Sequence, residues 1–251
     1  MSARANYGID SPAIVAGLFL LALFALGAAL TLHVFCDSRP FWLLGLLAFG
    51  SYFLMSAGSM VWYSKLGKLG IRDQILAEIP WRGDELVLDL GCGPGLLLVG
   101  AAHRLSTGKA IGLDRWVPGA ITANRPDAAI DNARLEGVSD RVEVKEGDVR
   151  HLPFADATFD VVVSNFVLHE VKTEADREQM LRELVRVLKP GGRFVLVDFI
   201  FTGRSVETLQ AIGIGDVKRV PAGSNISFWI TALLNFGLVQ TYQVTGSKAP
   251  D

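Results

Sequence analysis

A carboxylate and three glycines stand close together in the run Asp89-Leu-Gly-Cys-Gly-Pro-Gly95. The apolar residues of Leu86–Leu90 predict a β-strand that ends at this loop. Glycines let a ligand approach the backbone closely, and a helix that begins after them offers free amide groups. A carboxylate at the strand end suits a ligand with an ammonium or sulfonium group and suits a pyrophosphate poorly. The loop therefore predicts a site for a positively charged ligand.

The glycine spacing separates this loop from the one in dinucleotide-binding enzymes. Their pattern G-x-G-x-x-G would need a third glycine at position 96, where this chain has Leu96. The glycines here are Gly91, Gly93 and Gly95, with Cys92 between the first two. The spacing disfavours an oxidoreductase that uses NAD, an alternative that nicotinamide-dependent fluorescence changes would reveal.

From Glu85 onward, short β-rich segments alternate with helical patterns. Alternation of this kind predicts crossover units and a doubly wound, mainly parallel sheet with helices on both faces. Such sheets bind ligands beyond the carboxyl ends of their strands. The expected strands are 86–90, 110–113, 142–144, 159–163, 194–199 and 239–247, and the expected helices are 96–104, 126–135 and 173–188, with further helical patterns in 205–214 and 228–234.

Four more segments bring polar residues to the ends of these strands. Gly112-Leu-Asp114 ends the second strand, and Gly147-Asp-Val149 follows the third. The fourth strand and its loop cover Asp160–His169, and the turn Leu188–Arg193 comes before the fifth. Because parallel strands end at one edge of a sheet, we expect the side chains that follow the second, third and fourth strands to lie at that edge.

The run Asp89–Gly95 resembles motif I of the class I S-adenosylmethionine (SAM)-dependent methyltransferases, in the methyltransferase type 11 group, and the other four segments match in the family's order from Asp84 to about Phe201. The resemblance implies a Rossmann-like, mainly parallel seven-stranded sheet and SAM as the cofactor. It also implies that Asp114 grips the ribose hydroxyls and that Asp148 meets the adenine amino group. The full set of expected SAM contacts is Asp89, Gly91, Cys92, Gly93, Gly95, Asp114, Arg115, Asp148, Val149 and Asn165.

The loop after the second strand, from Arg115 to Arg125, is longer than the usual link in this family. Its Trp116 could cover the adenine or line the substrate entrance. It could equally anchor an enlarged surface loop, and the sequence leaves these alternatives open.

His169 follows the fourth strand, where the family's methyl group lies, and is the candidate catalytic residue. The ordinary pKa of histidine is near neutrality, so His169 could take a proton from a hydroxyl or an activated carbon. The alternative is a histidine that packs on its loop or binds the backbone. Asp198 and Phe199, at the end of the fifth strand, could face the acceptor.

Two apolar segments precede this region: Ser11–Cys36 and Pro40–Ser64 contain no Asp, Glu, Lys or Arg. At about 1.5 Å per residue, each can cross a hydrocarbon layer of about 30 Å. We expect an N-terminal transmembrane hairpin over 1–64, with spans at 12–35 and 41–63. A signal peptide is disfavoured because a second span follows directly, and a buried soluble pair is disfavoured because neither segment has a polar stripe.

Lys65, Lys68 and Arg72 follow the second span, whereas the turn between the spans carries only Arg39 beside Asp37. The positive-inside rule therefore predicts an integral membrane protein whose catalytic domain, 81–251, faces the cytoplasm with the N-terminus. The connector 65–80 fits an amphipathic helix on the membrane surface and, equally well, the first helix of the domain.

The net charge of −2 disfavours nucleic-acid partners, and the two cysteines cannot form a disulfide framework or a four-thiolate zinc site. We expect no bound metal, and an arsenite acceptor is disfavoured because such enzymes use several cysteines. The hairpin and the apolar segment 226–236 favour a lipid-like or small-molecule acceptor, although core packing also explains that segment. The alternatives are a soluble metabolite as acceptor, and a membrane-tethered SAM-binding protein without transfer activity.

Overall fold

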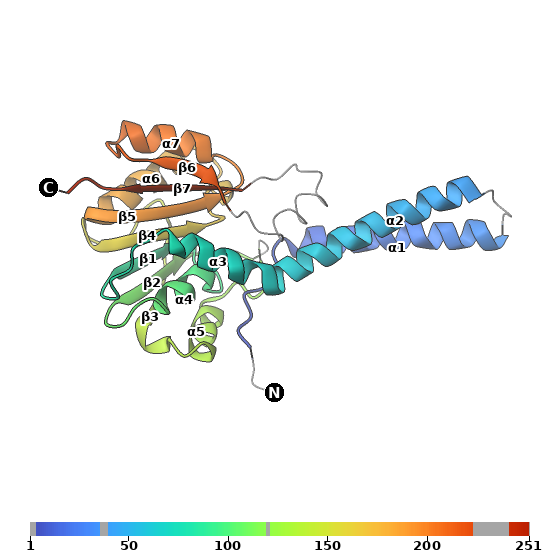
Figure 1. Cartoon of the computed structure of the whole chain (residues 1–251), viewed down its shortest axis with the longest axis horizontal. Helices are drawn as coiled ribbons and strands as arrows, with labels where there is room; N and C mark the ends of the chain where they lie inside the picture. The colour runs from blue at the N-terminus through green and yellow to red at the C-terminus, as the bar shows by residue number, and fades with distance from the viewer. Residues whose placement is uncertain (1–3, 36–39, 119–120, 223–240, 251) are drawn as a thin grey trace.

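The computed structural model describes residues 4–35, 40–118, 121–222 and 241–250, and shows two long helices that project from an α/β domain (Figure 1). Helix α1 spans Pro12–Phe35 and helix α2 spans Pro40–Trp62. The two helices lie side by side as a hairpin (Figure 1). Their bounds agree with the two apolar segments of the sequence.

Small residues let α1 and α2 pack closely, and large apolar residues cover their outer surface. A Cβ atom at Gly50 would lie 2.8 Å from the Leu26 side chain, so glycine permits the contact there. Both helices are long and apolar enough to cross a membrane by length and composition. A water-soluble helix keeps its outer face polar, and this pair does not. Exposed side chains on the pair include Leu20, Leu23, Phe24, Leu30, Phe41, Trp42, Leu44 and Phe49.

Helix α2 continues without a break into the α/β domain. A π-helical turn, η1 (Tyr63–Gly67), joins it to α3 (Lys68–Ala77). Ile75 and Leu76 of α3 are at most 1% exposed, and a Cβ atom at Gly100 of α4 (Leu96–Ala102) would lie 2.7 Å from Leu76. The later part of the connector, with Ile75 and Leu76, is therefore buried in the domain as its first helix, whereas Leu66 at its start is exposed.

Seven strands form one sheet in the order β3-β2-β1-β4-β5-β7-β6. Strands β1 to β5 are parallel, and β7 runs antiparallel to both β5 and β6, so the sheet is mainly parallel as expected. The strands are β1 (Leu86–Leu90), β2 (Lys109–Asp114), β3 (Val142–Glu146), β4 (Phe159–Asn165), β5 (Leu188–Asp198), β6 (Lys218–Pro221) and β7 (Tyr242–Ser247).

Helices cover both faces of the sheet, each over its own apolar core. One core contains buried residues of α3, α4 and α5 (Pro126–Leu135), and the other contains those of α6 (Glu174–Val187) and α7 (Thr202–Ala211). Two short 3-10 turns, η2 (Ser139–Arg141) and η3 (Leu168–Glu170), complete the domain. Thr173 caps α6, because its side chain accepts a hydrogen bond from the Asp176 backbone N–H.

Some expected bounds differ from the structure. Strand β5 begins at Leu188, before the glycine turn, because Leu188 pairs with Phe159 across a shift in register. The edge strand β6 was not expected, because its four exposed residues show no apolar alternation. The expected helix 228–234 and the first residues of the strand 239–247 lie outside the described residues.

Residues 5–10, which we call the N-terminal strap, lie on the catalytic domain although the sequence assigned them to the hairpin. The Asn6 backbone N–H donates to Oδ1 of Asn132 in α5 over 2.7 Å, and the Ile9 N–H donates to the Thr122 hydroxyl over 2.7 Å. The Lys68 ammonium donates to the Tyr7 carbonyl over 2.8 Å. Both ends of the hairpin are therefore attached to one domain.

We expect Leu76→Ala to lower the free energy of unfolding of the domain by about 2–5 kcal/mol, because it removes a fully buried side chain and leaves a cavity. Leu66→Ala, one helical segment earlier, removes an exposed side chain and serves as the matched control. Urea unfolding followed by tryptophan fluorescence in detergent micelles measures both. Equally small effects would contradict the placement of α3 in the core.

Candidate active site

The candidate site lies at the carboxyl edge of the parallel strands. Strand β1 lies between β2 and β4, so the strand order reverses at β1, and sheets of this kind bind ligands at the carboxyl ends of the strands at that point. Asp89 and Asp114 come from the ends of β1 and β2, and Asn165 and Asp198 end β4 and β5. The sheet thus brings to one edge four of the side chains that the sequence singled out.

The glycine loop after β1 is tightly enclosed. Gly91 has a φ of 68°, and a Cβ atom there would lie 2.3 Å from Val167 of the loop after β4. Gly95 has a φ of 88° and faces Ala129 of α5. Both positions need glycine, because other residues are strained at such φ values. Cys92 is buried in the core beneath the loop, so it can contact a cofactor only through its backbone.

Asp114 holds the glycine loop in place. One carboxylate oxygen accepts from the Gly93 N–H over 2.8 Å, and the other accepts from the Trp116 N–H over 2.6 Å. Each oxygen has a second lone pair, so both can still accept from a hydroxyl group. The Trp116 indole N–H donates to the Gly93 carbonyl over 3.2 Å. Trp116 therefore lies against the glycine loop and attaches the loop after β2 to it, a contact that both alternatives for this residue allow.

Asp148 is held by arginines. Its carboxylate accepts from Nε and Nη2 of Arg150 over 2.9 and 2.6 Å, and Nη1 of Arg115 lies 3.5 Å away. The hydrogen bonds from Arg150 hold the pKa of Asp148 well below its usual range. Val149 is partly buried against the second core. Arg115 and Asp148 thus belong to one charged group beside β2 and β3.

Three buried acceptor atoms near the glycine loop have no hydrogen-bond partner among the described residues. They are Oδ2 of Asp89, Oδ1 of Asn124 and Oδ1 of Asn165. Asp89 is 2% exposed, and this burial, with the nearby charge of Asp114, raises its pKa well above the usual range. Buried oxygens of this kind need donors, and a cation would restore the charged form of Asp89. SAM carries an ammonium group, an adenine amine and ribose hydroxyls, so these residues fit it.

His169 is paired with a buried carboxylate. Its Nδ1 lies 3.1 Å from Oδ2 of Asp198, which is fully buried and also accepts from the His169 backbone N–H over 3.2 Å. The Phe199 ring centre lies 4.7 Å from that of the imidazole. Burial alone lowers the pKa of His169, but the hydrogen bond and charge of Asp198 and the charge of Glu170 raise it above its usual value.

Sequence reasoning missed Asn132 of α5 and the N-terminal strap, which support the glycine loop. Asn132 is buried, and its amide donates to the Pro94 carbonyl over 2.9 Å and to the Asn6 carbonyl over 3.1 Å. It therefore joins the glycine loop to the N-terminal strap. A single asparagine within a helix belongs to no recognisable sequence motif. The strap is a short segment directly before a long apolar one, so the sequence pattern assigns it to the hairpin. No sequence signal could have paired them.

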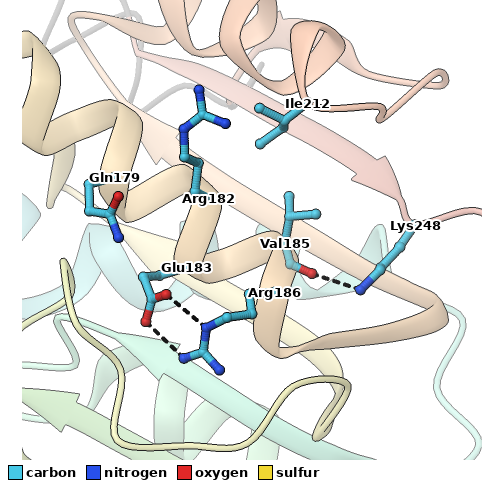
Figure 2. A pocket seen from close by; sticks show the side chains of 7 residues that line it. All are labelled: Gln179, Arg182, Glu183, Val185, Arg186, Ile212 and Lys248. Carbon is cyan, nitrogen blue, oxygen red and sulfur yellow. Dashed lines mark hydrogen bonds and ion pairs between the residues drawn. The ribbon is translucent and has the colours of Figure 1, made fainter.

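A surface hollow borders α6 (Figure 2). One of its lining residues, Lys248, follows Ser247, which pairs with Arg193 and not with the carboxyl end of β5. Some of its polar groups are already paired, because Arg186 donates to Glu183 and the Lys248 ammonium donates to the Val185 carbonyl. The part of the chain that the structure describes also contains no cluster of His, Cys, Asp and Glu that could hold a metal ion. We therefore place the site at the carboxyl edge. Residues Gln179, Arg182, Glu183, Val185, Arg186, Ile212 and Lys248 line the hollow.

Comparison with known proteins agrees with this placement. Residues 88–196 match the family described as "Methyltransferase domain". The demethylmenaquinone methyltransferase of Lactiplantibacillus plantarum is 38% identical over 128 residues, 51% of this chain and 50% of the relative. The 27-O-demethylrifamycin SV methyltransferase of Amycolatopsis mediterranei is 36% identical over 131 residues, 52% of this chain and 44% of the relative. The chain spans about half the length of these curated relatives.

A solved SAM-dependent methyltransferase from Aquifex aeolicus has the same fold, with a TM-score of 0.55 and 20% identity over 72% of this chain and 93% of that one. The glycine loop, Asp114 and Asp148 fall within the matched region, and Asp198 follows it by two residues. Residues 88–196 therefore form a methyltransferase domain, and the methyl donor that the comparisons support is SAM.

Proposed function

We propose that this protein is an integral membrane methyltransferase that moves the methyl group of SAM to a lipid-like small molecule. The observation that carries this proposal is the position of the hairpin. Asp10, two residues before α1, forms a β-bridge with Ile121 in the loop that follows β2, at the edge of the sheet that carries the site. The hairpin of two helices with apolar outer surfaces thus begins and ends beside the loop that follows β2.

The contacts at both ends of the hairpin support its insertion as a pair of spans. The strap precedes α1 and contacts α5 of the domain, whereas α3 follows α2 and packs on α4. Both ends of the hairpin must therefore lie on the same side of a membrane, as an even number of crossings requires. Lys65, Lys68 and Arg72 at this end favour the cytoplasmic side.

The cofactor would be held by the acceptor groups around the glycine loop. We assign the ammonium group to Asp89, the ribose hydroxyls to Asp114 and the adenine amine to Asp148, and Asn165 offers a further acceptor. Charge-assisted hydrogen bonds from the cofactor to these carboxylates would fix its orientation. The Gly91, Gly93 and Gly95 backbone would allow its close approach. When bound, SAM supplies a methyl group already activated by its sulfonium.

His169 would act as the general base for the acceptor. Asp198 accepts from Nδ1–H, and Nε2 lies 3.3 Å from Oε1 of Glu170. Nε2 therefore donates to Glu170 when the ring is charged and is the unprotonated nitrogen when the ring is neutral. Nε2 takes the proton from the acceptor's hydroxyl or activated carbon as that atom bonds to the methyl group, and later releases the proton to solvent. The backbone N–H groups of Phe199 and His169 hold Asp198 in place for this role.

A small lipophilic acceptor fits the site's surroundings. Phe166 and Phe199 flank the His169 ring, with ring centres 6.3 and 4.7 Å away. The two relatives named above act, by their names, on demethylmenaquinone and on a demethylrifamycin, which are small molecules. Apolar walls next to a base suit an acceptor whose ring or chain can be buried while its reacting atom meets the imidazole.

The test is transfer of a radiolabelled methyl group from SAM by the full-length protein, with membrane-lipid extract and soluble extract as separate acceptor pools. We expect label in the lipid pool. Label confined to the soluble pool would replace the lipid acceptor with a soluble metabolite. SAM binding without label in either pool would favour a membrane-tethered SAM-binding protein.

Asp89→Asn should weaken SAM binding by roughly ten- to a hundredfold, because a charge-assisted contact is worth about 1.5–3 kcal/mol. The change preserves shape and removes only the negative charge. Asp131→Asn, on the exposed surface of α5, is the matched control and should bind SAM normally. Isothermal titration calorimetry measures both. Unchanged binding by Asp89→Asn would remove this residue from the cofactor site.

The pH dependence of kcat should show an ascending limb centred above about 6.5, the ordinary pKa of histidine, because Asp198 raises the pKa of His169 and the base must be neutral. Asp198→Asn removes the stabilising charge, so the limb should move to lower pH. His169→Gln should lower kcat by roughly a hundredfold or more and abolish the limb. An unchanged pH profile in both variants would contradict the role of this pair.

A further inference from the structure

Four large apolar side chains are exposed on two loops and an edge strand near the site. Val117, Ile200, Phe201 and Val220, which we call the apolar rim, are between 37% and 53% exposed. Scattered apolar side chains are normal on a protein surface, but a group at one edge marks an interaction site. Phe201 also has a φ of 60°, a conformation that is rare for a bulky residue and is held here at a functional edge.

The rim residues belong to one edge of the sheet. Val117 follows β2, and Ile200 and Phe201 follow β5. Val220 lies in β6, which runs in the same direction as β5 because both are antiparallel to β7. Tyr242 pairs with both Asp198 and Pro221, the last residues of β5 and β6. The rim therefore surrounds the edge that carries His169.

This edge faces the hairpin. The Thr122 N–H donates to the Ile9 carbonyl over 3.1 Å, and the Ser64 hydroxyl donates to Asp10 over 3.0 Å. The start of α1 and the end of α2 therefore both lie at the loop after β2. In Figure 1 the hairpin extends from this side of the sheet, and the β6 arrow points toward it. Helices α2 and α3 form one continuous helix that ends in the core of the domain. The carboxyl edge of the sheet therefore keeps its position relative to the hairpin.

Basic side chains accompany the rim. The Arg177 guanidinium stacks 3.6 Å from the centre of the Phe201 ring, and the Arg219 guanidinium stacks 3.3 Å from the centre of the Tyr242 ring. Arg115 is exposed on the Val117 loop. Aromatic and apolar groups beside arginines match the layer of a bilayer where acyl chains meet anionic headgroups.

We propose that the apolar rim rests in the headgroup layer of the bilayer that holds the hairpin, so that the acceptor site opens directly into lipid. Ile200 and Phe201 follow Asp198, the partner of His169, within three residues. An acceptor that partitions into the membrane then reaches the base along an apolar surface without crossing water. The inference rests on the proposed membrane anchoring and adds the route and the class of acceptor.

Depth-dependent fluorescence quenching tests the proposal in the full-length protein. Single cysteines replace Val117, Ile200 or Val220 in a Cys36→Ser background and carry an environment-sensitive fluorophore, while the buried Cys92 stays unlabelled. The vesicles contain phosphatidylcholine and phosphatidylglycerol with spin labels on the headgroup or the acyl chain. SAM binding by each labelled variant confirms that the domain is folded.

Matched controls separate the rim from the rest of the surface. Ile130→Cys and Leu135→Cys place the label on exposed apolar positions of α5, outside the rim, and Phe24→Cys places it on the outer surface of α1. We expect rim labels to be quenched at least threefold more strongly by headgroup-labelled lipid than the α5 labels. The Phe24 label should be quenched by acyl-chain-labelled lipid.

Two results would overturn the proposal and are distinguishable. Rim labels quenched no more than the α5 labels, with the Phe24 label quenched, would remove the rim from the bilayer and leave the anchoring intact. A Phe24 label that no lipid quenches would remove the anchoring and the rim contact together. Methyl transfer is measured separately, so neither result depends on identifying the acceptor.

Discussion

One unbroken helix that serves two different surroundings sets the arrangement of this molecule. From Pro40 to Ala77 the chain stays helical, with a π-helical turn at Tyr63–Gly67. Its first part presents apolar side chains outward, and its last part fills the core beside α4. A helix cannot bend freely without a break in its hydrogen bonds, so the hairpin and the sheet hold a fixed relation. This helix therefore fixes the position of the carboxyl edge of the sheet beside the hairpin.

A second connection reinforces the first through a single carboxylate. Glu136, next to the end of α5, accepts from the Tyr7 hydroxyl in the strap, from Arg72 in α3 and from His103 after α4. Burial alone raises the pKa of Glu136, but these donors hold it below its usual value, so the carboxylate stays ionised among them. The Glu136 carboxylate therefore joins the strap, the connector helix α3 and the ends of α4 and α5. The same surface supports the glycine loop through Asn132 and Pro94.

The sequence predicted the features that rest on local patterns. Helix α5 and strand β1 matched their expected bounds, because periodicity and the glycine loop mark them clearly. It could not decide the place of α3, whose amphipathic pattern suits a bilayer and a protein core equally. It also could not reveal the orphaned oxygen of Asn124, the pairing of Asp148 with Arg150 or the strap contacts. These features depend on tertiary neighbours, which a single sequence does not specify.

The strap has a consequence for the order in which the molecule assembles. Asn6 and Tyr7 are synthesised before their partners Asn132 and Glu136, which lie 126 and 129 residues later in the chain. Helices α1 and α2 and the sheet residues that precede α5 are made between them. The contacts between the strap and α5 can therefore form only after α5 has been made. The strap closes onto the domain late, although it lies early in the chain.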